Sequence, residues 1–427
     1  MKNKLLLFGL FVMTMNIAEA QFSLSGEFRP RTEFRHGFGS IIPESAEPGL
    51  SVATRIRLNA GYKTESYKFF LSLQDVFVWG ENRQILPNDQ NNSFAVFQAW
   101  AEIGLGGGFS TKLGRQVLSY DDQRILGGLD WAQQGRNHDA ALLKYKKDSF
   151  SADLALAFNQ DHENAGGFVN VGNNFNTSGF FTYKVMQMLH LHKGWDKFSG
   201  SLLFMNNGFE NHSLNLNETV YLQTFGTHLK YKTGALALEA NGFLQTGRAI
   251  YGANYQDVES GYLAGLEAKY KVSDKVTVGL GAEIISGDSE ADATATSAFF
   301  PLYGTNHKFN GFMDYFYVGN HANTVGLFDI HASVNFKLDE KASLMVKVLN
   351  FSGEQELGSG EKQLGTEVDL VYKRGFKGFT IVAGYSHMFA SDGMYELKGV
   401  AENLAADNQN WAWAMLVIKP KFLNGTK

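Results

Sequence analysis

Apolar and polar residues alternate with a period of two along much of this chain. The first clear example has Phe22, Leu24, Phe28 and Phe34 on its apolar face and Glu27, Arg29, Arg31, Glu33 and Arg35 on its polar face. Because successive side chains of a β-strand point to opposite faces, this pattern predicts strands with one apolar and one charged face. We expect about eighteen strands, which begin near residues 22, 51, 67, 94, 109, 138, 150, 178, 197, 218, 235, 258, 275, 326, 341, 361, 377 and 411.

The joints between the predicted strands are alternately short and long. Short polar turns occupy residues 63–66, 106–108, 146–149, 193–196, 232–234, 273–274, 338–341 and 374–377. The longest of the other joints, rich in Gly, Asn and Asp, are residues 79–93, 120–136, 159–176 and 288–325. A membrane β-barrel has this asymmetry, because its short turns face the periplasm and its long loops face the outside. The chain is therefore predicted to be all-β, a transmembrane antiparallel β-barrel of about 18 strands in the cell outer membrane.

The N-terminal segment has the three parts of a secretory signal peptide. Two lysines form a basic start, residues 5–17 are apolar, and a small-x-small Ala-Glu-Ala sequence follows as the cleavage site. We therefore predict a signal peptide at residues 1–20 and a barrel at residues 21–427, with no separate soluble or plug domain.

Composition narrows the functional classes further. The chain has 427 residues, no cysteine and a formal net charge of -5. The absence of cysteine excludes disulfides and thiolate metal sites, and the negative charge argues against a nucleic-acid partner. Aromatic residues cluster beside the short turns, which is where a barrel wall meets the membrane interface. Outer-membrane lipid is thus the expected partner of the apolar faces.

The charged faces of the first two strands carry five arginines. They are Arg29, Arg31 and Arg35 on the first strand and Arg55 and Arg57 on the second. A guanidinium group binds a carboxylate through two parallel hydrogen bonds and stays charged at any ordinary pH. A row of such groups along a wet lumen would bind and release an acidic saccharide. The alternative interpretation is that Glu27, Glu33 and other acidic residues neutralise these arginines. The charged side chains would then only keep the lumen filled with water.

Residues 120–136 form a long loop that is dense in Asp, Gln and Arg. The Gly127-Gly128 pair provides a hinge or a tight turn within it. Long loops of defined polar content are usually functional, so we predict that this loop folds inward and narrows the pore. The alternative is an exposed outer loop.

Several stretches resemble the alginate export family of outer-membrane proteins. They are residues 113–117, 120–127 and 130–139 (LGRQV, YDDQRILG, DWAQQGRNHD), residues 301–314 (PLYGTNHKFNGFMD), and residues 364–370 with 384–386 (LGTEVDL, GYS). The resemblance implies an eighteen-stranded barrel that conducts an anionic uronic-acid polysaccharide outward, through a pore narrowed by arginines paired with acids. The matching positions are Arg115, Asp122, Arg124, Arg136 and Asp139, and we add Glu367 and Asp369 of the last stretch to the expected pore lining.

No metal, cofactor or catalytic centre is expected. His190 and His192 would share one face of a strand, but the sequence offers no evident third ligand. Asp288, Glu290 and Asp292 alternate without the remainder of a calcium-binding loop. Because no nucleophile is paired with a base, an enzyme is not expected.

These patterns predict a passive channel for an anionic polysaccharide or oligosaccharide of the alginate-like polyuronate type, with an arginine-lined lumen. Export is the favoured direction, and periplasmic export machinery would then be a partner. The alternative is a general or anion-selective porin for small solutes. A monomer is expected, since nothing in the strands demands an oligomer.

Overall fold

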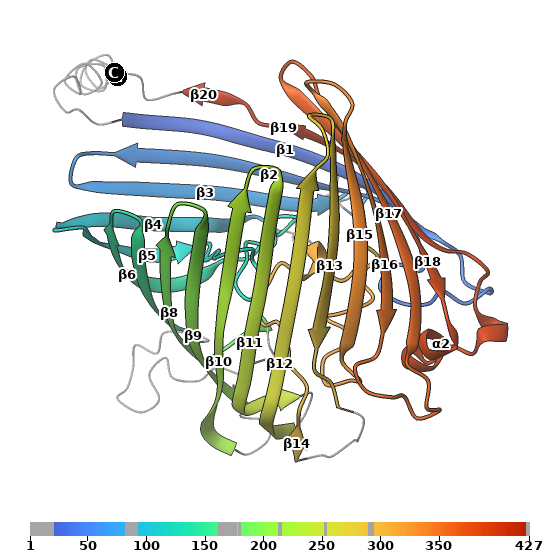
Figure 1. The fold of residues 1–427 in the computed structure, drawn as a ribbon. Helices are drawn as coiled ribbons and strands as arrows, with labels where there is room; N and C mark the ends of the chain where they lie inside the picture. Colours follow the sequence, from blue (N-terminus) through green and yellow to red (C-terminus); the bar gives the residue numbers. More distant parts are fainter. Residues whose placement is uncertain are drawn as a thin grey trace.

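The computed structural model of this chain describes residues 21–81, 93–160, 177, 181–211, 216–251, 254–288 and 294–423. The predicted signal peptide lies outside these residues, and so do Glu290 and Asp292 of the acidic triplet. The described chain forms one large β-barrel, in which successive strands run around the ring in sequence order (Figure 1).

Twenty strands belong to one sheet, and all of them except the short β14 and β20 form the wall, which gives the predicted eighteen. The wall strands are β1 (Gln21–His36), β2 (Gly49–Lys63), β3 (Tyr67–Val78), β4 (Ala95–Gly106), β5 (Phe109–Gln116), β6 (His138–Lys147), β7 (Phe150–Phe158), β8 (Val185–Gly194), β9 (Phe198–Asn211), β10 (Leu216–Thr233), β11 (Leu236–Tyr251), β12 (Asn254–Lys271), β13 (Val276–Ile285), β15 (Leu327–Lys337), β16 (Ala342–Ser352), β17 (Gln363–Gly375), β18 (Phe379–Ala390) and β19 (Gln409–Ile418). Neighbouring wall strands are antiparallel, and β1 pairs with β19 to close the ring. Closure leaves no unpaired strand edge in the membrane.

The predicted strand positions are confirmed, with one clear deviation at β8. This strand begins at Val185, whereas its predicted start near residue 178 lies outside the described residues. Just before it, Tyr183 is buried, and its hydroxyl oxygen lies 2.8 Å from Nδ1 of His138. The chain therefore turns toward a partner inside the barrel before it joins the wall.

The final strand is interrupted by a proline. β19 ends at Ile418, and β20 (Lys421–Leu423) continues the antiparallel pairing with β1. Pro420 lies between them and has no N–H group for the ladder, but its carbonyl oxygen accepts a hydrogen bond of 2.9 Å from the backbone of Gly26. The final strand, predicted to begin near residue 411, is therefore present in two pieces.

The two faces of the wall differ as the sequence pattern predicted. On β1 and β2, the apolar side chains of Phe28, Ile56 and Leu58 are exposed, whereas Glu27 and Arg55 are buried. Exposed rows of large apolar side chains are unfavourable in water and favourable in lipid. The apolar face therefore meets the membrane, and the charged face points inward.

Aromatic pairs lie beside the short turns. The ring centroids of Tyr62 and Tyr67 are 6.0 Å apart across one turn, and those of Trp195 and Phe198 are 5.3 Å apart across another. Such residues suit the interface between lipid and water, where an apolar ring can keep a polar edge in contact with water.

Short helices occur only in loops within the described parts of the chain. They are η3 (Asn306–Lys308), α2 (Asp392–Lys398) and η4 (Glu402–Leu404). Over those same ranges, we find no helix with the length and apolar character to cross a membrane.

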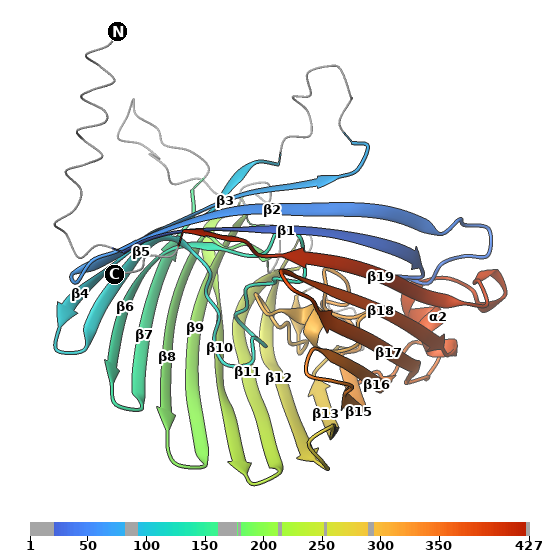
Figure 2. The ribbon, with the colours of Figure 1, turned by 90° about the horizontal axis from the view of Figure 1, so that it is seen from above.

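Two long loops cross the space enclosed by the wall (Figure 2). We call residues 117–137, between β5 and β6, the first inner loop, and the described residues 286–288 and 294–326, between β13 and β15, the second inner loop. The second inner loop supplies much of the buried apolar cluster, including Phe299, Tyr303 and Phe316. The core of this protein is therefore inside the barrel, built by loops packed against the inner face.

Candidate functional site

The first inner loop is fixed to the inner face of β1. Nη1 of Arg29 donates a hydrogen bond of 2.7 Å to the carbonyl oxygen of Asp130. Nη1 of Arg31 donates one of the same length to the carbonyl oxygen of Trp131. The loop therefore folds inward, as its polar content predicted.

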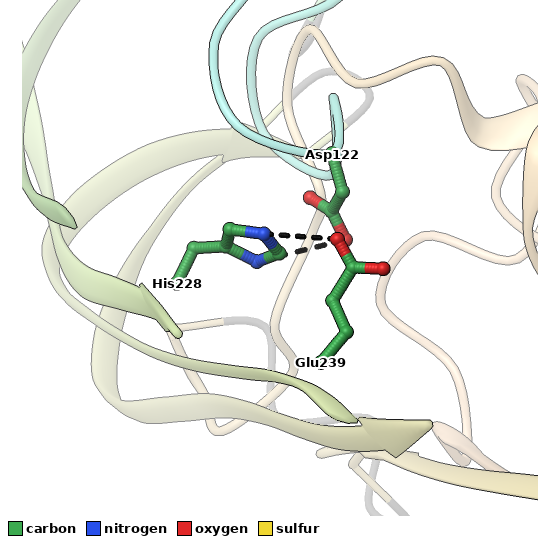
Figure 3. Close-up of side chains that lie close together, drawn as sticks. All are labelled: Asp122, His228 and Glu239. Carbon is green, nitrogen blue, oxygen red and sulfur yellow. Dashed lines mark ion pairs between the residues drawn. The ribbon is translucent and has the colours of Figure 1, made fainter. Parts of the chain in front are cut away.

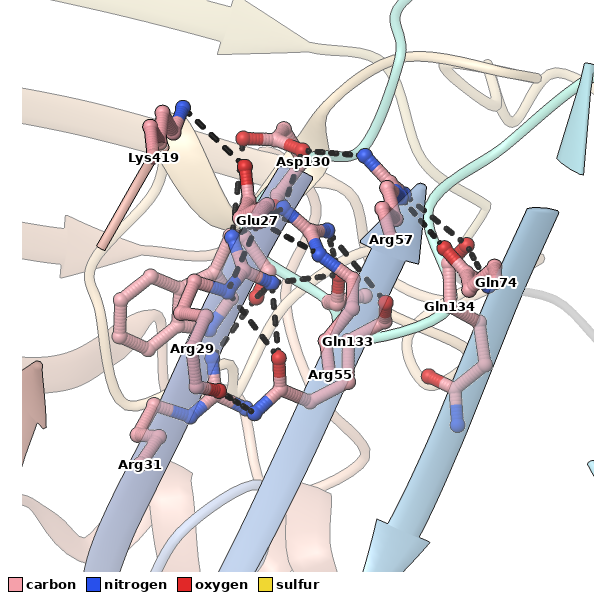
Figure 4. A network of polar contacts seen from close by, with 12 residues as sticks. Glu27, Arg29, Arg31, Arg55, Arg57, Gln74, Asp130, Gln133, Gln134 and Lys419 are labelled. Carbon is pink, nitrogen blue, oxygen red and sulfur yellow. Dashed lines mark hydrogen bonds and ion pairs between the residues drawn. The ribbon is translucent and has the colours of Figure 1, made fainter. Parts of the chain in front are cut away.

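Arg55 is at the centre of the contacts between this loop and the wall (Figure 4). It has no exposed surface, and it donates to the carboxylate of Glu27 at 2.8 Å and to that of Asp130 at 2.9 Å. Arg57 reaches the same oxygen of Asp130 at 3.3 Å, and Nζ of Lys419 is 3.1 Å from Glu27. Because buried charges need partners, these carboxylates make the burial of Arg55 tolerable.

Cationic side chains outnumber carboxylates in this region. The set that we call the arginine cluster contains Arg29, Arg31, Arg35, Arg55, Arg57, Lys419, Glu27, Glu33 and Asp130. It has six cations and three carboxylates. The side chain of Asp130 is 66% exposed, so one acidic group of the cluster faces the water of the lumen. The cluster is thus partly neutralised, and its excess charge is positive.

The start of the first inner loop is fixed to the opposite part of the wall. The hydroxyl of Tyr120 donates to Asp153 on β7 at 2.9 Å. Asp121 accepts a hydrogen bond of 2.8 Å from Ser201 on β9 and lies 3.1 Å from Nε2 of His190 on β8. The loop therefore spans the lumen from one side to the other.

Two of the predicted site residues hold the middle of the loop. Asp122 accepts a hydrogen bond of 2.6 Å from Asn241 on β11. Arg124 is almost completely buried; it donates to Glu283 on β13 and, at 2.9 Å, to Asn310 of the second inner loop. Both side chains are therefore engaged with protein groups and position the loop.

Arg136 lies near the end of the same loop. Its Nη1 donates a hydrogen bond of 3.2 Å to the carbonyl oxygen of Gly304, and its guanidinium lies 5.5 Å from the ring centre of Phe181. Burial lowers the pKa of Arg136 to about 10, so the group remains cationic at neutral pH.

The second inner loop packs directly against the first. The rings of Trp131 and His307 are stacked with centroids 4.5 Å apart, and Nζ of Lys308 donates to the carbonyl oxygen of Asp122 at 2.7 Å. The sequence predicted residues 288–325 only as a long loop. Its aromatic and histidine content, within the stretch at residues 301–314, is the signal that indicates packing in retrospect.

The backbones of the two inner loops lie against each other at two glycines, Gly127 and Gly304. The backbone N–H of Gly127 donates to the carbonyl oxygen of Tyr303 at 2.9 Å. A Cβ atom at Gly304 would overlap the carbonyl oxygen of Arg124. This contact therefore depends on the absence of a side chain at residue 304.

A Gly304→Ala substitution is expected to separate the inner loops at a cost of about 1–3 kcal/mol. Single-channel recording should then show larger and noisier conductance than in the unchanged protein. Gly242→Ala is the matched control, because the nearest atom to its new Cβ is 4.0 Å away, on Thr227. Equal conductance and noise in the Gly304→Ala and Gly242→Ala variants would contradict a close fit between the loops.

Glu367 and Asp369 are on the inner face of β17 but are covered by the second inner loop. Both are fully buried. A carboxylate oxygen of Glu367 accepts a hydrogen bond of 2.9 Å from the backbone of Met313, and Asp369 accepts one from the hydroxyl of Ser386. Their predicted place in an open pore lining is wrong, because the loop above them was not anticipated.

Arg115 and Asp139 are placed differently from the prediction. They form an ion pair of 2.8 Å between β5 and β6, and their side chains are 41% and 51% exposed. Arg115 is two residues from the exposed Leu113 on β5, and Asp139 is four residues from the exposed Leu143 on β6. An even separation along a strand places two side chains on the same face, so both charges share the outer face with these leucines. Strand alternation therefore directs both charges away from the lumen, and the prediction that they line the pore is wrong.

Two water-accessible cavities lie on the short-turn side of the inner loops. One has a volume of about 240 Å³ and the other about 310 Å³. Their walls carry side chains of both signs: Lys269, Lys308, His331 and Lys347 with five carboxylates in the first, and His190, His192, His228 and Lys230 with Asp121 and Asp153 in the second. Most of these residues lie near short turns at strand positions whose side chains point inward, and this alternation could have identified them from the sequence.

Comparison with protein families decides the relationship of this chain. The family model described as alginate export matches residues 21–387. The chain belongs to the alginate export family. As a member of that family with this fold, the protein is an outer-membrane channel, and channels of this type are not enzymes.

Solved outer-membrane proteins share the fold. OccAB4 of Acinetobacter baumannii has a TM-score of 0.62 at 14% identity, with 94% of this chain and 99% of that chain covered. OccK11 (OpdR) of Pseudomonas aeruginosa has a TM-score of 0.58 at 13% identity, over 95% and 97%. OpdK of Pseudomonas aeruginosa, solved with vanillate, has a TM-score of 0.59 at 10% identity, over 93% and 99%. No curated protein matches the chain.

Proposed function

We propose that this alginate export family member conducts anionic saccharides of the polyuronate type, with export as the favoured direction. The observation that carries the proposal is the cationic excess of the arginine cluster beside the first inner loop. A polyuronate has one carboxylate per sugar, and guanidinium groups in a narrow passage attract such a chain electrostatically.

The cavities on the short-turn side carry side chains of both signs. Their lysine and histidine side chains would contact a polymer that enters from the periplasm before it reaches the arginine cluster, and neighbouring carboxylates such as Glu267 and Asp329 would keep that contact weak. Several weak cationic sites in series permit both entry and exit, which conduction requires. Periplasmic export machinery would supply the polymer to this rim.

A second candidate function is an anion-selective porin for small solutes. It is favoured by the packing of the two inner loops, which join through the Trp131–His307 stack and leave cavities of only a few hundred Å³ beside them. The related fold of OpdK has been solved with vanillate, a small carboxylate. Both candidates share anion selectivity and differ in the size of the solute.

Replacement of Arg57 by glutamine is expected to lower the anion-to-cation permeability ratio roughly threefold, or by about 0.7 kcal/mol. Arg57 contacts the exposed carboxylate of Asp130, so its charge contributes to the field in the lumen. Reversal potentials in planar bilayers under a salt gradient measure this ratio. Arg115→Gln is the matched control, because its charge is on the outer face.

Blocking experiments separate the two candidate functions. If the passage accepts polyuronate, that polymer should block the current at concentrations where a neutral oligosaccharide of equal size does not, and Arg57→Gln should weaken the block. Block by small carboxylates alone would favour the small-solute porin. Weak ion selectivity, with block that depends only on solute size, would contradict both and indicate a general porin.

A further inference from the structure

Three potential metal ligands converge where the first inner loop meets the wall (Figure 3). Asp122 comes from the loop, His228 from β10 and Glu239 from β11. One ring nitrogen and one oxygen from each carboxylate lie within 4.8 Å of one another. The donor set of one imidazole and two carboxylates is of a kind that zinc accepts in proteins.

Asn241 determines which nitrogen of His228 carries a proton. Its Nδ2 must face Asp122, 2.6 Å away, because a carboxylate only accepts hydrogen bonds. Its Oδ1 therefore faces Nδ1 of His228 at 2.7 Å, and that nitrogen donates the hydrogen bond. Nε2 is then the nitrogen whose lone pair is available to a metal ion.

The short distance between Nε2 of His228 and Glu239 is favourable only if a positive charge lies at this position. Nε2 lies 3.0 Å from Oε1 of Glu239. A neutral imidazole would place two acceptors opposite each other at this distance, which is unfavourable without a positive species between or beside them. A second proton on the ring or a bound metal ion would each satisfy both groups.

We propose that Asp122, His228 and Glu239 form a site for a divalent transition-metal ion of the zinc type, which ties the first inner loop to the barrel wall. Tetrahedral coordination at zinc distances separates ligand atoms by roughly 3.4 Å, so the three groups, now within 4.8 Å of one another, would have to draw closer around a bound ion. Asn241 orients the imidazole from behind, a role that hydrogen-bonding partners of ligating histidines commonly have. The proposal does not depend on which solute the channel conducts.

The three residues border the two cavities on the short-turn side of the inner loops. Asp122 and Glu239 line the cavity of about 240 Å³, and His228 lines that of about 310 Å³. Lys230 competes for the site, because its Nζ lies 3.0 Å from Oε1 of Glu239. Its side chain is 49% exposed, so it can turn into the water when a metal ion binds.

Calorimetric titration of the purified, folded barrel with zinc chloride tests the proposal. We expect one saturable site, lost in His228→Ala and in Glu239→Gln, and weakened about 10- to 100-fold in Asn241→Ala. Lys230→Ala should bind zinc more tightly, because the competing ammonium is gone. Cobalt(II) should give visible absorption of a low-coordinate site in the unchanged protein and none in His228→Ala.

His331→Ala is the matched control, since His331 also faces the lumen and pairs with one carboxylate, Asp329, at 3.0 Å. It should leave zinc binding unchanged. Gel mobility before and after heating shows whether each variant retains a folded barrel. Absence of saturable binding, or binding that persists in the folded His228→Ala and Glu239→Gln variants, would overturn the proposal and leave His228 as an imidazolium paired with Glu239.

Discussion

An Arg55→Ala variant is expected to release the end of the first inner loop from the wall. The change removes the hydrogen bonds to the carboxylates of Glu27 and Asp130. Glu27 then stays buried with Lys419 at 3.1 Å and Arg29 at 3.9 Å as its remaining cations. Loss of one partner from a buried ion pair typically costs about 3–5 kcal/mol. The large value follows from desolvation, because Glu27 keeps its burial and loses its closest cation.

Hydrogen exchange and channel recording together measure this effect. Backbone amides near residues 130–134 should exchange at least about a hundredfold faster, since each 1.4 kcal/mol of local stability is a factor of ten. Conductance should rise as the loop becomes free. Arg374→Ala is the control: its ion pair with Asp339 is exposed and is worth about 0–1 kcal/mol. Unchanged exchange in Arg55→Ala would show that the carbonyl contacts of other arginines suffice.

Substitution of Glu283 by alanine is expected to have a second large effect, at the centre of the first inner loop. Arg124 is buried between Glu283 and Asn310, and its Nε and Nη1 have no hydrogen-bond acceptor among the described residues. Without the carboxylate, a buried guanidinium would keep its charge with little compensation, at a cost of about 3–5 kcal/mol. The loop should then leave its position.

A double-mutant cycle distinguishes ion-pair loss from a simple packing defect. The single variants Arg124→Met and Glu283→Leu should each destabilise the loop, because each leaves one buried charge without its partner. The double variant Arg124→Met/Glu283→Leu should recover most of the stability, since an apolar pair of similar volume has no charge to desolvate. Hydrogen exchange at residues 120–126 reports each state. If the losses of the single variants simply add in a double variant, the two side chains do not act as a pair.

The outer-face position of Arg115 shows how two signals in the sequence can conflict. Its motif resembles the family pattern, which suggested a pore residue. Its strand alternation, with Leu113 two positions earlier, places it outside. The alternation was the better guide, because the geometry of a strand fixes the side of each residue.

The sequence by itself determined the barrel, its strand positions, its two faces and its short turns. These properties depend on local sequence. A strand with lipid on one side and water on the other has apolar and polar residues in alternation, and each short turn is specified by a few adjacent residues. The inner position of Arg29, Arg31, Arg55 and Arg57 followed from the same rule. The sequence also indicated correctly that residues 120–136 enter the barrel.

Only the tertiary structure decided what the inward side chains contact. Arg124 meets Glu283 across 159 positions of sequence, and Asp122 meets Asn241 across 119. The second inner loop covers Glu367, and the backbone of the first inner loop engages the arginines of β1. Such contacts depend on how two long loops fold together within a closed ring, and no local periodicity encodes that arrangement. The barrel can therefore be predicted from the sequence, whereas the contacts of the side chains in its lumen depend on how the two inner loops pack.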